Sequence, residues 1–197
     1  MKEKIKKLSN EEFKLLVSCL RGAYQQFCFS KIGHKDIGGK IYENKTDNDK
    51  NFIFIWDSIL ISLRSSYLIN FAKIFDKPSY PCKDGERNTL SIFRAIPPDK
   101  FDTDHLKIID NILQIRNKLV AHLDAEAMLQ GKQLEKDYGL DFEGKKIKSL
   151  IVKTYELINQ IKGDFGYSHE LNQIQEESYV QKEFDKWYEI FRATYNN

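Results

Sequence analysis

The chain has 197 residues, of which 41% are hydrophobic and 30% charged, and its formal net charge is +2 at pH 7. This composition is typical of a globular chain long enough for one well-buried core, and it excludes a disordered polymer. The small net charge excludes a strong global field toward nucleic acid or an anionic membrane.

Three cysteines are present, an odd number without a Cys-x-x-Cys pair. This pattern argues against a disulfide framework and against a thiolate zinc site, and a reducing cytoplasm fits it best. The N-terminus leads to no apolar signal core. Charged and amide side chains interrupt the most apolar run, residues 52–75, so we expect a buried helix there and no membrane span.

The first expected element is a helix over residues 10–29. Ser9 followed by Glu12 is a capping box, and apolar residues then recur at helical spacing. Residues 30–49 contain three glycines among polar residues and keep no lasting period, so we expect a loop there.

A second helix is expected near residues 51–75, and Asp76-Lys77-Pro78 should end it because proline lacks an amide donor and disfavours helical geometry before it. Residues 77–88 are rich in turn formers and are expected to form a loop. The short apolar segment 90–96 is expected to be helical and to stop at Pro97.

The next expected helix is long. Asp102-Thr103-Asp104 offers N-capping oxygens, and an apolar stripe follows at Leu106, Ile109, Leu113, Val120 and Leu123. After a glycine-marked loop, another amphipathic face begins near residue 147, and its start is basic.

A last helix is expected over residues 168–193, as part of a C-terminal helical extension, 164–197, that carries seven acids against three bases. No run alternates convincingly as a strand. The sequence therefore predicts an all-α fold, a single-domain helical bundle of four to six helices over residues 1–197.

Residues 116–122 read Arg-Asn-Lys-Leu-Val-Ala-His. With Leu106 at 0° on a straight helix, Arg116 falls at about 280°, inside the apolar arc where a leucine is expected. A guanidinium there must reach water along its stem, pair with an acid such as Asp110, or face a cleft. The sequence leaves these three alternatives open.

Arg116 and His122 carry complementary chemistry. Arginine stays charged and fits phosphate oxygens with a planar fork, while histidine exchanges a proton near pH ~6.5. Together they suit phosphodiester cleavage. His122 lies about 9 Å further along a straight helix and about 120° around it, so a shared site needs a helix end near residues 120–123 or a second subunit.

The string from Arg116 to Asp124, on a long helix of an all-helical domain, resembles the signature of HEPN-domain proteins: an arginine, four to six residues and a histidine. Asn117 fits the family preference for a polar residue after the arginine. The Ala-His-x-Asp ending, and an upstream helix that closes with residues 72–76, are similar to the AbiU-like abortive-infection branch.

This resemblance implies a HEPN-type endoribonuclease that cleaves RNA without metal or cofactor, as a toxin or an abortive-infection (phage defence) effector. Arg116 and His122 would be catalytic, with Asn117 and Asp124 in support. The side chains that would bind RNA are Lys118, Lys145, Lys146 and Lys148.

The resemblance also implies a homodimer with a composite active site, and it leaves open whether an antitoxin partner exists. Asp124 stands where HEPN toxins that are silenced by AMP transfer have tyrosine, so that regulation is not expected here. Two rival interpretations remain. One is a non-catalytic helical module that binds a nucleotide or a partner protein, and the other is a structural bundle in which Arg116 pairs with an acid and His122 caps a helix.

Overall fold

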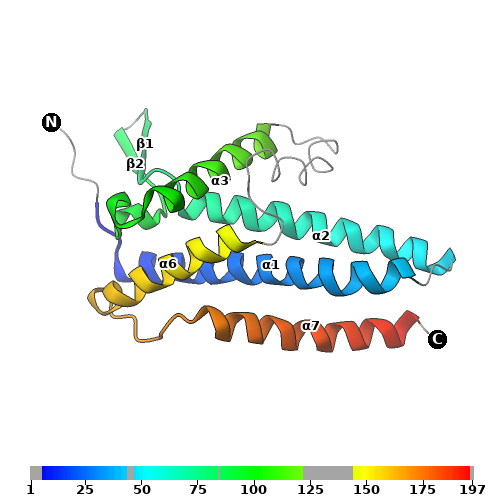
Figure 1. Cartoon of the computed structure of the whole chain (residues 1–197). Helices are drawn as coiled ribbons and strands as arrows, with labels where there is room; N and C mark the ends of the chain where they lie inside the picture. Colours follow the sequence, from blue (N-terminus) through cyan, green and yellow to red (C-terminus); the bar gives the residue numbers. More distant parts are fainter. Residues whose placement is uncertain (1–5, 44–46, 84, 122–143, 196–197) are drawn as a thin grey trace.

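The computed structural model describes residues 6–43, 47–83, 85–121 and 144–195 of the chain, and long α-helices dominate it (Figure 1). The elements, in chain order, are α1 (Asn10–Glu43), α2 (Asp47–Ile74), β1 (Ser79–Cys82), β2 (Gly85–Asn88), a 3-10 turn (Ile92–Arg94), a second 3-10 turn (Pro98–Lys100), α3 (Thr103–Ala121), α6 (Lys145–Ile161), a third 3-10 turn (Lys162–Phe165) and α7 (Gln173–Tyr195). The predicted all-α class is confirmed.

Helix α1 lies at the centre of the bundle. Figure 1 shows α2 along one side of α1 and α7 along the other, while α3 packs on α2 and α6 contacts both α3 and α7. Phe13, Leu16 and Leu20 of α1, Phe71 of α2 and Ile112 of α3 are among the fully buried core residues. None of the described helices is long and apolar enough to cross a membrane.

The capping box at the start of α1 is confirmed. The Ser9 amide donates to Glu12 Oε2 at 2.8 Å, and the Glu12 amide donates to Ser9 Oγ at 3.1 Å. The helix then continues to Glu43, so the predicted loop over residues 30–49 is wrong: residues 30–43 belong to α1 and residues 47–49 to α2. Each glycine costs a helix about 1 kcal/mol, and the packing of α1 on α2 offsets this cost.

The predicted loop over residues 77–88 is also wrong in part, because β1 and β2 form an antiparallel hairpin there. Tyr80 lies opposite Arg87, and Cys82 lies opposite Gly85. Strands of four residues are too short for alternation to be recognised. Pro81 is tolerated because both strands of a two-stranded sheet are edges.

The buried stripe of α3 differs from the predicted one. Ile108, Ile109, Ile112 and Ile115 are buried, whereas the side chain of Leu106 is exposed. At about 100° per residue, the buried arc is centred roughly 70–85° away from the predicted centre. Arg116 still falls within this arc.

Helix α7 is held on α1 by its acids. Glu176 accepts from Arg21 Nε at 2.5 Å and from Gln25 Nε2 at 2.6 Å, and Glu177 accepts from the Tyr24 hydroxyl at 2.5 Å. The helix begins at Gln173 rather than at residue 168. Two of the seven acids of the C-terminal segment, Glu176 and Glu177, therefore serve docking between helices.

Gly144, which precedes α6, should not accept a larger residue. Its φ is +69°, and an added Cβ would lie 2.2 Å from Phe27 Cζ in the core. We expect Gly144→Ala to lower the free energy of unfolding by about 2–3 kcal/mol, because the left-handed backbone and the clash both oppose a side chain. Urea denaturation measures the loss.

The matched control is Gly22→Ala within α1, where an added Cβ meets nothing within 4 Å. Alanine in a helix interior is favoured over glycine by roughly 0.5–1 kcal/mol, so this variant should be slightly more stable than the parent. Equal stability of the two variants would contradict the argument.

Candidate active site

Arg116 lies on α3 with one-fifth of its side chain exposed, and it pairs with Asp76 just after the end of α2. Arg116 Nη1 lies 2.5 Å from Asp76 Oδ2. Of the three alternatives for Arg116, pairing with an acid is the one found, but the acid is not Asp110. Asp110 instead accepts a hydrogen bond from Gln114 on the same helix.

Asp76 accepts hydrogen bonds at both carboxylate oxygens and at its main-chain oxygen. Its Oδ1 accepts from the Lys77 amide at 2.8 Å and from the hydroxyl of Tyr80 on β1. Its main-chain oxygen accepts from Ser91 Oγ at 2.5 Å. Because only 12% of the side chain is exposed, this carboxylate depends on protein donors rather than on water.

These contacts keep both partners charged. Burial raises the pKa of Asp76, but the hydrogen bonds from Arg116, Tyr80 and the Lys77 amide outweigh it, so the pKa lies below its ordinary value. Burial likewise disfavours the charged guanidinium, and the bond to Asp76 outweighs it and raises the pKa of Arg116. A fixed ion pair results at neutral pH.

Asn117 lies next to this pair. Its Oδ1 accepts from Arg116 Nε at 2.9 Å, while the rest of the side chain is exposed. The structure thus brings Arg116 and Asn117 together and adds Asp76 and Tyr80. His122 and Asp124 lie outside the described residues, and α3 is described as far as Ala121, the residue before His122.

The predicted RNA-binding lysines are in different situations. Lys118 on α3 and Lys145 and Lys146 at the start of α6 are exposed. Lys148 Nζ instead lies 2.9 Å from Glu177 Oε1 and 3.0 Å from Glu177 Oε2, so this ammonium ties α6 to α7. Lys148 is therefore part of the contact between α6 and α7.

The sequence reasoning missed Asp76 and Tyr80 as members of the site. The sequence does show Asp76 at the end of an apolar helix and directly before Lys77-Pro78. It is also the last residue of the segment 72–76 that carried the family resemblance. Its partner, however, is 40 residues away in sequence. Tyr80 could not be placed, because the hairpin that carries it was not predicted.

A surface pocket of about 480 Å³ lies between α1 and α7, and among the described residues none of the predicted site residues lines it. Its lining includes Arg21, Gln25, Glu176 and Tyr179. Within the part of the chain that the structure describes, no group of three or more His, Cys, Asp or Glu side chains could hold a metal ion.

Acid should weaken the fold through Asp76. Because its folded pKa is depressed, the stability it contributes is fully present above its unfolded pKa, and this contribution is lost as the pH falls through the folded value. The stability difference between the parent and Asp76→Asn should therefore be largest near neutral pH and should shrink below about pH 4. Urea denaturation across pH 2.5–7 measures it, and a difference that stays constant over this range would contradict the argument.

The helical bundle, with a paired arginine on its long helix α3 six residues before a histidine, has the organisation of a HEPN domain. The HEPN family model described as AbiU2 matches residues 11–182. Because this match covers most of the chain, the chain belongs to the AbiU2 family of HEPN domains.

The match includes the first part of α7. Comparison with curated proteins and with solved structures gave no match.

Proposed function

We propose that this chain is a metal-independent endoribonuclease of HEPN type that acts as a toxin or abortive-infection (phage defence) effector. The observation that carries the proposal is the state of Arg116. Its guanidinium is charged and held by Asp76 and Asn117, one-fifth of its side chain is exposed, and it lies six residues before His122 in an AbiU2-family chain.

In the proposed reaction, His122 takes the proton from a ribose 2′-hydroxyl, and the oxygen attacks the adjacent phosphorus. The bond to the 5′-oxygen breaks, and that oxygen receives a proton from a histidine. Arg116 stabilises the additional negative charge on the phosphate oxygens in the transition state. The products are a 2′,3′-cyclic phosphate end and a 5′-hydroxyl end.

The remaining predicted residues support this reaction. Asn117 holds the Nε side of Arg116, and Asp124 would orient His122. Lys118, Lys145 and Lys146 would contact the RNA backbone, where each cation gains affinity by releasing counterions. A homodimer would supply a second histidine, so that one acts as base and the other as acid.

The direct test is an assay of the purified full chain with single-stranded RNA in excess EDTA, with a DNA strand of the same sequence beside it. We expect the RNA to be cleaved and the DNA to stay intact, and we expect the RNA products to carry cyclic phosphate ends. Light scattering should give a dimer. Cleavage of DNA, or RNA ends without a cyclic phosphate, would contradict 2′-hydroxyl attack.

A non-catalytic module remains the second candidate, because an arginine paired with a carboxylate can also serve binding. It predicts that a nucleotide or a partner protein binds in a way that needs Arg116 while no RNA tried is cut. Induced expression of the parent beside His122→Ala, scored for growth arrest and RNA integrity, separates the two candidates in cells.

A further inference from the structure

The geometry points to Asp76 and Tyr80 as positioning residues, which fix the Arg116 guanidinium in one orientation so that its remaining N–H donors face the scissile phosphate of RNA. This inference rests on the proposed ribonuclease function and extends it to two residues. Neither of them touches the phosphate. Both act through Arg116.

The anchor is built from three separate elements. Arg116 comes from α3, Asp76 follows α2, and Tyr80 comes from β1. The two carboxylate oxygens have distinct partners: Oδ2 accepts from Arg116, and Oδ1 accepts from Tyr80 and the Lys77 amide. This division prevents the carboxylate from rotating, so the guanidinium meets a fixed acceptor.

The anchor also leaves part of the guanidinium for a substrate. An arginine has five N–H donors in a planar fork. Among the described residues, hydrogen bonds to Asp76 and Asn117 use one donor on Nη1 and the donor on Nε, and the Tyr80 hydroxyl also interacts with the guanidinium. One-fifth of the side chain is open to solvent, which gives a phosphate a direction of approach.

Fixing the arginine before RNA binds has an energetic consequence. A free arginine side chain has many rotamers, and this freedom must otherwise be lost when the side chain engages the phosphate. An arginine already held by Asp76 has lost most of this freedom on folding. Less entropy is therefore lost when the transition state forms, which is the advantage of a preorganised arginine.

The hairpin gives Tyr80 its role. The Tyr80 side chain is 38% exposed, and its hydroxyl donates to Asp76 Oδ1, a bond that raises the pKa of Tyr80 above its ordinary value. The hydroxyl therefore stays protonated at neutral pH. Without the hydroxyl, Oδ1 would keep the Lys77 amide as its protein donor, and Asp76 would be held less tightly.

The opposite role for Asp76 is autoinhibition, in which the carboxylate competes with phosphate for Arg116. The two roles predict opposite signs for Asp76→Asn. Asparagine keeps the size of the residue but can turn an amide donor toward Arg116 Nη1, which breaks the anchor. A positioning residue loses activity on this change, and an inhibitor gains it.

Steady-state cleavage of a short RNA by the full chain tests the inference. We expect Asp76→Asn to lower kcat about tenfold or more with KM changed less than about threefold, and Tyr80→Phe to lower kcat about threefold. Asp110→Asn is the matched control: it neutralises an exposed acid on the same helix as Arg116 and should leave kcat unchanged. In an Arg116→Ala background, Asp76→Asn should cause no further loss.

A second measurement does not depend on cleavage. The chain has six arginines, and the Nη–H signals of Arg116, whose Nη1 donates to Asp76, are identified in a low-temperature NMR spectrum by their loss in Arg116→Ala. We expect slow hydrogen exchange at this site in the parent and exchange about tenfold faster in Asp76→Asn. Tyr80→Phe changes an exposed residue, so it also tests the inference if Asp76→Asn folds poorly.

The outcomes separate the two proposals. Absence of RNA cleavage by the parent refutes the proposed function, and cleavage that survives Arg116→Ala removes Arg116 from the active site and overturns the positioning role with it. Cleavage that needs Arg116 but is unchanged or increased in Asp76→Asn leaves the proposed function standing and overturns the positioning role. Unchanged Nη–H exchange in Asp76→Asn overturns the positioning role as well.

Discussion

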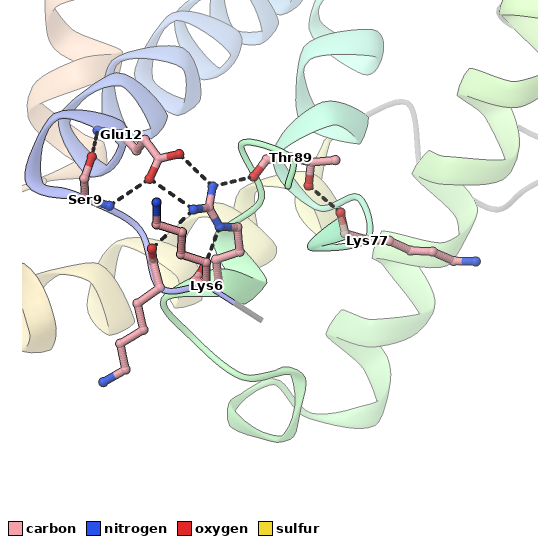
Figure 2. A network of polar contacts seen from close by, with 7 residues as sticks. Lys6, Ser9, Glu12, Lys77 and Thr89 are labelled. Atoms are coloured by element: carbon pink, nitrogen blue, oxygen red, sulfur yellow. Dashed lines mark hydrogen bonds and ion pairs between the residues drawn. The ribbon is translucent and has the colours of Figure 1, made fainter. Parts of the chain in front are cut away.

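Replacing Arg94 with methionine is expected to lower the free energy of unfolding by about 3 kcal/mol. Only 2% of this side chain is exposed. The guanidinium donates to the main-chain oxygens of Lys6, Lys7 and Thr89 and to both carboxylate oxygens of Glu12, at 2.8–3.2 Å. Lys6, Glu12 and Thr89 of this polar network are labelled in Figure 2. Methionine fills similar space and satisfies none of these acceptors.

Most of the expected cost comes from the three carbonyl oxygens. The Glu12 side chain is 39% exposed, so water can replace part of its bond to Arg94. The hydrogen bond from Arg94 is also the main reason that the pKa of Glu12 lies below its ordinary value. In Arg94→Met this pKa should rise toward the value of a free glutamate.

Thermal and urea denaturation measure the loss, and two variants serve as controls. Arg87→Met removes an exposed arginine from β2 and should change stability by less than about 0.5 kcal/mol. Arg94→Lys keeps the charge without the planar fork and should fall between Met and the parent. If Arg94→Met were as stable as Arg87→Met, the network would contribute no net stability.

Local patterns in the sequence were enough to predict most of the helices. The capping box of Ser9 and Glu12 and the capping carboxylate of Asp102 each act within one turn, and both are found where the sequence placed them. The position of Arg116 on the inner face of α3 likewise follows from helical spacing alone. Signals of this kind need no knowledge of distant contacts.

The remaining features depend on contacts between distant residues. Arg94 meets residues 6, 7 and 12 more than eighty positions upstream, and Arg116 meets Asp76 across 40 positions. A pattern within one helix cannot identify such partners. The sequence analysis therefore named Asp110, a near neighbour, as the acid that could pair with Arg116. The loop predicted from the glycines of residues 30–43 was wrong for the same reason, because packing between helices overrides a local preference.

Arg116→Ala and His122→Ala are each expected to lower the rate of RNA cleavage by about a thousandfold. Arg116→Ala removes the charge that stabilises the transition state, and His122→Ala removes the group that moves the proton. Lys107→Ala is the control, because it removes an exposed cation from the same helix as Arg116. Its cleavage rate should stay within about twofold of the parent rate, since this variant changes only the general charge of the surface.

The fold must be checked beside the rate, because Arg116→Ala also leaves Asp76 largely buried without its partner. This loss should lower the free energy of unfolding by about 1–3 kcal/mol, so the assay must be run well below the melting temperature. Arg116→Lys supplies the sharper comparison. Lysine can keep a charge near Asp76 but lacks the planar fork, so a variant that is folded, binds RNA and cleaves it slowly would assign the loss to phosphate geometry. Full activity in Arg116→Lys would mean that charge alone is sufficient, and full activity in Arg116→Ala or His122→Ala would remove that residue from the active site.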